Sequence, residues 1–242
     1  MRILVISDIH ANLTALEAVL ADAGSVDATW CLGDLVGYGP DPNECIQRLQ
    51  LVPNLSCLIG NHDAAVLGRL DLFSFNVEAR QALQWTQNVL KPKCQEYLNS
   101  LPERLVIGAV TLVHGSPRLP IWEYLLDTYN ATQNFAYFDT PYCFVGHSHL
   151  PVVYHLVNGR THADLFIPEV GERVVLSPRA ILNPGSVGQP RDRDPRAAYA
   201  LFDPSEQTWE LHRVAYDIAS VQDRMRTAGL PERHIQRLSD GW

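Results

Sequence analysis

The sequence predicts an α/β protein on the borderline of α+β, and three observations lead to this class. Apolar runs at residues 2–7, 29–32 and 55–59 alternate with helical patterns, and this βαβαβ order implies parallel strands joined by right-handed crossovers. From about residue 104 the chain instead alternates apolar and polar residues, as half-exposed antiparallel strands do. The chain shows no internal repeat, low-complexity tract or obvious linker, so we expect one domain over residues 1–242.

Helix signals flank and interrupt these strands. Asn12 is a predicted N-cap, and Asp41-Pro42 combines a cap with proline at the first helical position. Residues 64–100 are mostly helical in pattern, with Asn76 as a cap, so we expect a helical insertion that forms a wall or cap over the strand ends. The remaining predicted helices are residues 218–228 and a short one after Pro231.

The second part of the chain supplies the other predicted strands. Several of them carry the period-two alternation of a sheet with one buried face. These strands are residues 104–107, 110–113, 142–145, 152–157, 173–176, 198–202 and 208–214.

Five of the predicted strands end in a residue that can bind a metal ion. In open α/β sheets, ligands gather at the carboxyl edge of the strands, so these side chains converge if the five strands share such an edge. Two carboxylates, an amide and two imidazoles crowded together call for a cation. The five residues are Asp8, Asp34, Asn61, His114 and His147.

Neighbouring residues enlarge this set. His10 lies two residues after Asp8, and in an extended chain residues two apart point the same way. Gly146-His147-Ser148-His149 adds a further histidine. Each residue alone is explained by a helix cap, a turn or a surface histidine, but these explanations weaken for the whole set. Imidazole with carboxylate suits Mn, Fe, Zn or Co better than Ca or Mg, and seven ligands fit two metal ions rather than one.

The ordered series of motifs resembles the calcineurin-like metallophosphoesterase family. It is most similar to small bacterial members related to phage-type protein phosphatases and diadenosine tetraphosphatases. This resemblance implies a four-layer αββα sandwich of two mixed β-sheets flanked by helices. The motifs are Asp8-x-His10, Gly33-Asp34, Gly60-Asn61-His62-Asp63, His114 and Gly146-His147-Ser148-His149.

The resemblance also implies a role for each residue. Asp34 would bridge two divalent transition-metal ions, which share a hydroxide that attacks phosphorus. His62 would be the general acid that protonates the leaving oxygen, with Asp63 beside it as the orienting partner. The implied ligands of one metal are Asp8, His10 and His149, and those of the other are Asn61, His114 and His147.

The chain departs from the family's protein phosphatases at one position. Those enzymes carry an Asp-Arg pair soon after the second motif, whereas residues 34–40 here contain no arginine. Phosphate binding therefore needs a substitute, and guanidinium groups match phosphate oxygens well. Arg191 is the favoured candidate, ahead of Arg118 and Arg193, although each could simply be solvated or paired with a carboxylate. Tyr38, in a glycine-rich loop beside Asp34, is expected to line the substrate cleft.

An aromatic segment follows the fourth motif. Residues 121–138 could stack a nucleobase, but we favour an amphipathic helix that buries its aromatic side chains. The aromatic residues are Trp122, Tyr124, Tyr129, Phe135, Tyr137 and Phe138.

Composition restricts the partners. A net charge of −8 argues against extended nucleic-acid binding, which depends on lysine and arginine at phosphates. Five cysteines without a CxxC pair, no signal peptide and no membrane-length apolar stretch predict a cytoplasmic protein that does not enter membranes. In a reducing cytosol, Mn or Fe is favoured over Zn, Ni or Co. The expected partner is a small phosphorylated substrate, and the oligomeric state is open.

The reaction expected from these observations is hydrolysis of a phosphoric ester. A nucleotide-type phosphodiesterase or dinucleoside polyphosphate hydrolase competes with a phosphomonoesterase, because only the leaving-group pocket differs. A phosphoprotein phosphatase and a catalytically inactive metal-binding scaffold are the alternatives. The scaffold is disfavoured because all seven ligands and His62 are present.

Overall fold

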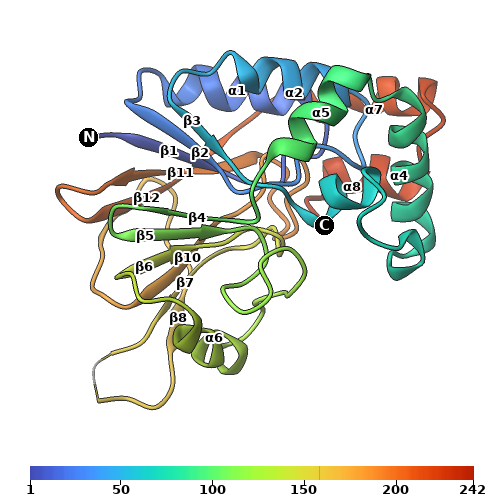
Figure 1. Ribbon diagram of the computed structural model, residues 1–242. Coiled ribbons are helices and arrows are strands. Elements are labelled where there is room, and N and C mark those ends of the chain that lie inside the picture. The colour runs from blue at the N-terminus through green and yellow to red at the C-terminus, as the bar shows by residue number, and fades with distance from the viewer. Residues whose placement is uncertain (158) are drawn as a thin grey trace.

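Two β-sheets lie face to face in the computed structural model, which describes residues 1–157 and 159–242 (Figure 1). The first is a six-stranded sheet in the order β3-β2-β1-β11-β12-β9. Its strands are β1 Ile3–Ile6, β2 Ala28–Cys31, β3 Leu55–Cys57, β9 Arg173–Val175, β11 Ala197–Asp203 and β12 Thr208–Val214.

The second sheet is also six-stranded, in the order β4-β5-β6-β10-β7-β8. Its strands are β4 Arg104–Ile107, β5 Val110–Val113, β6 Tyr142–Phe144, β7 Pro151–His155, β8 Asp164–Phe166 and β10 Ala180–Pro184.

Both sheets are mixed. The strands β1, β2 and β3 run parallel, as the βαβαβ pattern predicts, and β11 pairs antiparallel with β1. In the second sheet β5, β6 and β10 run parallel, whereas β4 and β7 are antiparallel to their neighbours. Parallel neighbours end at the same edge, so each sheet delivers several loops to one side of the molecule.

Helices cover the outer faces of the two sheets (Figure 1). Helices α1 and α2 lie over the first sheet, α6 lies below the second, and α4, α7 and α8 stand together at one end. The helices are α1 Leu13–Ala23, α2 Pro42–Gln50, α3 Asn61–Val66, η1 Leu72–Ser74, α4 Val77–Val89, α5 Pro92–Ser100, α6 Thr128–Asn134, η2 Phe135–Tyr137, α7 Ile218–Thr227 and α8 Glu232–Asp240.

The buried apolar residues follow this layering. A core between the two sheets contains Trp30, Phe144 and Trp209, and another lies between the first sheet and its helices around Leu16 and Ile46. Burial of this apolar area is the main favourable term in folding, and it fixes the sheets against each other. The predicted four-layer αββα sandwich is confirmed.

Two strands escaped prediction. The strand β10 is fully buried between β6 and β7, yet its sequence Ala-Ile-Leu-Asn-Pro has only three apolar residues before two typical turn residues. The strand β8 is exposed along its length and lies at the edge of the sheet, so its apolar pattern carried little signal.

The aromatic segment also differs from the prediction. Instead of one amphipathic helix over residues 121–138, the structure has only the short α6 and η2 there. Phe135 and Phe138 are buried, but Trp122 and Tyr124 are 39% and 42% exposed. The burial of the aromatic side chains is therefore only partly as expected, because an irregular loop precedes α6.

Candidate metal centre

The loops that follow five strands bring the predicted ligands together. β1, β2 and β3 come from the first sheet, whereas β5 and β6 come from the second. The sequence-based expectation assumed that the five strands share one sheet edge, but they belong to two sheets. Convergence occurs because the loop-bearing edges of the two packed sheets lie side by side, and all the ligands are buried there.

The backbone at this site is strained. Asp8, His10, Asp34, His147 and His149 have φ of 55°, 49°, 54°, 65° and 61°, the left-handed region that residues with a Cβ rarely adopt. Such strain collects where a function requires it. It also corrects the extended-chain argument, because Asp8 and His10 approach each other through a turn rather than along a strand.

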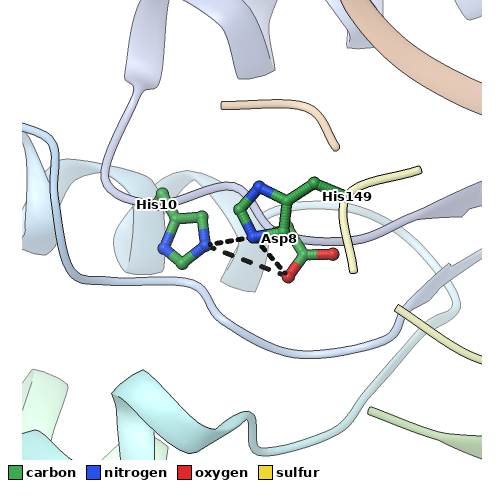
Figure 2. A group of neighbouring side chains, drawn as sticks. All are labelled: Asp8, His10 and His149. Atoms are coloured by element: carbon green, nitrogen blue, oxygen red, sulfur yellow. Dashed lines mark hydrogen bonds and ion pairs between the residues drawn. The ribbon is translucent and has the colours of Figure 1, made fainter. Parts of the chain in front are cut away.

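One ligand group consists of Asp8, His10 and His149 (Figure 2). The Nε2 atoms of the two histidines lie 3.1 Å apart, and the Asp8 Oδ1 lies 3.4 Å from Nε2 of His149 and 3.9 Å from that of His10. That Oδ1 has no hydrogen-bond partner among the described residues although it is buried. A buried carboxylate oxygen left unpaired is costly, so the group is incomplete without a ligand.

Backbone carbonyls fix the histidine tautomers in this group. His10 Nδ1 lies 3.1 Å from the Val36 carbonyl, and His149 Nδ1 contacts the Gln189 carbonyl. A carbonyl only accepts, so each Nδ1 carries the hydrogen and each Nε2 presents a lone pair. Two lone pairs facing each other at 3.1 Å repel, and a cation between them turns this repulsion into coordination. The residues therefore fit a transition-metal ion.

A second group contains Asn61, His114 and His147. His114 Nε2 lies 3.1 Å from Asn61 Oδ1, and its Nδ1 donates to the Leu32 carbonyl at 2.9 Å. His147 is turned the other way, since its Nε2 lies 3.1 Å from the Trp122 carbonyl. Its Nδ1 is the atom left to bind a metal ion.

Asp34 lies between the two groups. Its Oδ2 is 3.6 Å from Nε2 of His10 in the first group and 3.3 Å from Nε2 of His114 in the second. The same oxygen is buried and has no hydrogen-bond partner among the described residues. Its Oδ1 accepts a hydrogen bond of 2.8 Å from the His62 backbone N–H. One oxygen is thus held by the backbone while the other faces both histidine sets.

The charges in this cluster perturb one another. Burial raises the pKa of Asp8 to about 7, against the lowering effect of His114. Burial also acts to raise the pKa of Asp34, but the neighbouring histidines outweigh it and hold that pKa well below its usual value. Burial acts to lower the pKa of His114, yet Asp34 raises it to about 9. Asp34 and His114 thus favour each other's charged forms.

His62 is buried beside the same cluster. Its ring lies 4.8 Å from that of His10 and 4.4 Å from that of Tyr38, and its Nδ1 has no partner among the described residues. Burial lowers the pKa of His62 well below its usual value, with Asp34 opposing the shift. His62, His10 and Asp34 also lie close enough together to form a third metal-binding group. Geometry alone does not separate His62 from the ligands.

Asp63 does not orient the His62 side chain, which corrects the expectation. Its Oδ1 accepts from the Val36 N–H and its Oδ2 from the Gly60 N–H, each at 3.0 Å. Both oxygens are therefore used to join the loop after β2 to the start of α3. The residue fixes the backbone around Asp34 and Asn61, and in the described part of the chain no hydrogen bond joins it to the imidazole of His62, which precedes it in sequence.

Gly60 leaves room for the Asp34 carboxylate. A Cβ at this position would lie 2.1 Å from Asp34 Oδ1, although the φ of −101° suits any residue. We therefore expect Gly60→Ala to displace Asp34 and to weaken Mn²⁺ binding by about 10–100-fold, the range found when a support of a metal ligand is lost. Titration calorimetry measures this affinity. Gly108→Ala is the control: a Cβ there meets nothing within 4 Å, and the strain of its φ of +57° should lower Tm but leave the Mn²⁺ affinity unchanged. Equal losses of affinity in the two variants would contradict the steric explanation.

Two of the four candidate substrate-binding residues lie at the edge of the cluster, whereas the guanidinium group of Arg193 lies 5.5 Å from the centre of the Trp242 ring. Tyr38 is buried, with its ring 4.6 Å from that of His10. Arg191 Nη2 lies 3.4 Å from the Tyr38 hydroxyl and 3.2 Å from Gln189 Oε1. Its Nε is buried and unpaired among the described residues. The guanidinium group is thus anchored at one nitrogen and retains capacity for an anion.

Arg118 is directed elsewhere, and this corrects the expectation that it binds the substrate. Its guanidinium group forms an ion pair with Glu123 and lies 5.9 Å from the centre of the Tyr137 ring. The carboxylate of Glu123 satisfies the charge that a phosphate would otherwise neutralise. Arg118 is only four residues from His114, which suggested that it could reach the site. Its guanidinium group instead binds Glu123.

Comparison with known proteins identifies the family. The model of the calcineurin-like phosphoesterase superfamily domain matches residues 1–207. The chain belongs to this superfamily.

Similar proteins cover the chain almost end to end. The uncharacterized protein MJ0912 of Methanocaldococcus jannaschii is 40% identical over 245 residues, which span 98% of this chain and 96% of that protein. The crystal structure of a metallophosphoesterase from Sphaerobacter thermophilus has a TM-score of 0.90 at 52% identity, covering 100% of this chain and 99% of the other. The hypothetical protein PH1004 from Pyrococcus horikoshii OT3 shares the fold, with a TM-score of 0.80, 22% identity and coverage of 100% and 98%.

Part of this calcineurin-like phosphoesterase site was missed in the sequence. The ring of Tyr124 stacks on that of the candidate ligand His147 at 3.7 Å, and the ring of His234 in α8 lies 4.5 Å from that of Tyr38. The helix α8 lies beyond the residues that the family model matches. The sequence predicts a short helix after Pro231 but no role for it in the site; the one sequence signal for such a role is that Arg233 and Arg237 are four residues apart and so share one helix face.

Proposed function

We propose that this chain is a metal-dependent phosphoric-ester hydrolase that binds two divalent transition-metal ions. The observation that carries the proposal is the buried, unpaired Oδ2 of Asp34, which lies within 3.6 Å of one histidine group and 3.3 Å of the other. A carboxylate oxygen in this position suits a bridge between two cations. Asp8, His10 and His149 would hold one ion, and Asn61, His114 and His147 the other.

The donor set favours a borderline transition metal. Imidazole nitrogens with carboxylate and amide oxygens suit Mn, Fe, Zn, Ni or Co, and we favour Mn or Fe. When bound, two such ions supply a water of lowered pKa as the nucleophile and polarise the phosphoryl group.

The protein's own groups would perform the remaining steps. His62 lines a cavity of about 140 Å³ together with Phe75 and Trp122, and the leaving group would occupy it. An oxygen from water bonds to phosphorus, the bond to the leaving oxygen breaks, and His62 gives that oxygen its proton. The negative charge of the substrate beside His62 favours the protonated imidazole that this step requires. Arg191 would bind a phosphoryl oxygen, with Tyr38 holding its guanidinium group in place.

The proposed substrate is small. The family's protein phosphatases carry an Asp-Arg pair soon after the second motif, whereas residues 34–40 of this chain contain no arginine. An inactive scaffold is disfavoured because all seven ligand residues and His62 converge. No helix among the described residues has the length and apolar character of a membrane span. A cytoplasmic location remains part of the proposal, supported by five cysteines that are all free.

Assays on metal-reconstituted protein test this function. We expect hydrolysis of p-nitrophenyl phosphate, bis(p-nitrophenyl) phosphate or a dinucleotide analogue in the presence of Mn, Fe, Co, Ni or Zn. The absence of hydrolysis of every ester with every metal would overturn the proposal and support the scaffold.

Metal removal should destabilise the folded chain. A ligand that binds only the folded state stabilises it by about 2.7 kcal/mol at a hundredfold excess over its Kd. For a chain of this size, chelation of the metal should therefore lower Tm by about 5–10 °C. Differential scanning calorimetry with and without EDTA measures the shift, with metal content checked by mass spectrometry. An unchanged Tm after proven removal of all metal would contradict a site that is incomplete without it.

A further inference from the structure

A second cavity lies on the other side of Tyr124. It has a volume of about 490 Å³, within the range typical of small-ligand sites. Tyr124 and Arg191 connect it to the metal centre, because they contact His147 and Tyr38. It is lined by Tyr124, Leu126, Ser148, Leu150, Arg191, Arg233, Arg237 and Trp242.

Positive charge gathers in this cavity without matching negative charge. Among the residues that the structure describes, no carboxylate lies within 4 Å of the guanidinium groups of Arg191 or Arg237, whereas Arg233 pairs with Glu78 at 3.6 Å. The Nε atoms of Arg191 and Arg237 are buried and have no hydrogen-bond partner in this described part. Guanidinium groups at a cavity wall that no nearby carboxylate neutralises are suited to bind an anion.

The surroundings of Arg237 disfavour its charge. Burial, together with Arg191 and Arg233, lowers the pKa of Arg237. An anion that binds between neighbouring guanidinium groups offsets the repulsion between their positive charges. The geometry of the cavity and its charge therefore indicate the same ligand class.

The two cavities offer separate places for the leaving group and for the substituent that stays on phosphorus. His62 lines the smaller cavity and is absent from the larger, whereas Arg191 and Arg237 line the larger and are absent from the smaller. If the leaving group departs beside its proton donor, the substituent that stays on phosphorus faces the arginines. A phosphomonoester has no such substituent and would leave the larger cavity empty.

On the basis of the proposed function, we propose that the cavity lined by Arg191 and Arg237 binds an anionic arm that remains on the attacked phosphorus. The substrate class is then an ester of a nucleoside polyphosphate rather than a phosphomonoester. Arg191, which contacts the attacked phosphoryl group, also binds the next phosphate of the chain together with Arg237. The nucleoside lies against the apolar wall. That wall is formed by Leu126, Leu150 and the indole of Trp242, which is 57% exposed.

Two substrates with the same leaving group test this inference. The β-(p-nitrophenyl) ester of ADP carries an arm with an extra phosphate, whereas bis(p-nitrophenyl) phosphate carries a neutral arm. In the Mn²⁺-loaded enzyme, Arg237→Ala should lower kcat/KM for the ADP ester about 10–100-fold more than for the neutral diester, mainly through KM. Arg237→Gln, which keeps a long side chain, should show the same selectivity if the alanine variant folds poorly.

Arg226→Ala is the matched control, because it removes an exposed guanidinium group from the neighbouring helix α7. It should change neither kcat/KM by more than about twofold. Equal losses for both substrates in the Arg237 variants, or a wild-type preference for p-nitrophenyl phosphate, would overturn the anionic-arm site while leaving the proposed hydrolase intact. If no ester is hydrolysed with any metal, the proposed function itself fails.

Discussion

The Asp34→Asn variant is expected to lose the dinuclear centre while keeping its fold. Asparagine retains the Oδ1 that accepts the His62 N–H, but its neutral amide replaces the unpaired Oδ2 that faces both histidine groups. We expect fewer than two metal ions per chain and a loss of roughly a thousandfold in kcat, about 4 kcal/mol of transition-state stabilisation. Mass spectrometry of the metal content and steady-state kinetics measure the two effects.

The control for this variant is Asp139→Asn, which removes an exposed carboxylate outside the cluster. It should bind two metal ions and turn over like the wild type. Two tightly bound ions and near-normal turnover in Asp34→Asn would show that the carboxylate does not bridge. Circular dichroism and Tm distinguish loss of the centre from loss of the fold.

His62→Asn should lower turnover without removing metal. General acid catalysis by one side chain contributes about 10²–10⁴-fold, so kcat should fall by that factor for an alkyl leaving group. The loss should shrink for p-nitrophenol, because a stable phenolate departs without a proton. Kinetics over a series of leaving groups, with metal content measured alongside, tests the assignment.

The metal measurement also separates the two roles that geometry leaves open for His62. Loss of one metal ion in His62→Asn would make this residue a ligand of the group it forms with His10 and Asp34. A loss of turnover that does not depend on the leaving group would likewise contradict the general acid. His162→Asn, which changes an exposed histidine, is the control and should alter neither quantity.

The layers of the fold and the meeting of the predicted ligands could be predicted because they depend on strong local signals. Buried strands followed by Asp8, Asp34 or His114 carry both the strand pattern and the donor chemistry. Two features of the site differ from the sequence prediction. The strands come from two sheets, and Asp8 and His10 approach through left-handed backbone rather than along an extended chain.

The remaining features depend on contacts between distant segments. Asp63 accepts hydrogen bonds from the backbone N–H groups of Gly60 and Val36, and Arg118 forms an ion pair with Glu123. The spacing of the sequence motifs does not reveal either interaction. The arginine-lined cavity was missed because Arg237 reaches it from a helix far along the chain, and only the packing of α8 near Tyr38 brings it there.

The most direct test of the central claim is anomalous diffraction at the manganese absorption edge from crystals of Mn²⁺-loaded protein. The proposal predicts two peaks about 3.5–4 Å apart with Asp34 between them. One peak should be bound by Asp8, His10 and His149, and the other by Asn61, His114 and His147. A single peak, or a peak that Asp34 does not touch, would contradict a dinuclear centre bridged by this carboxylate.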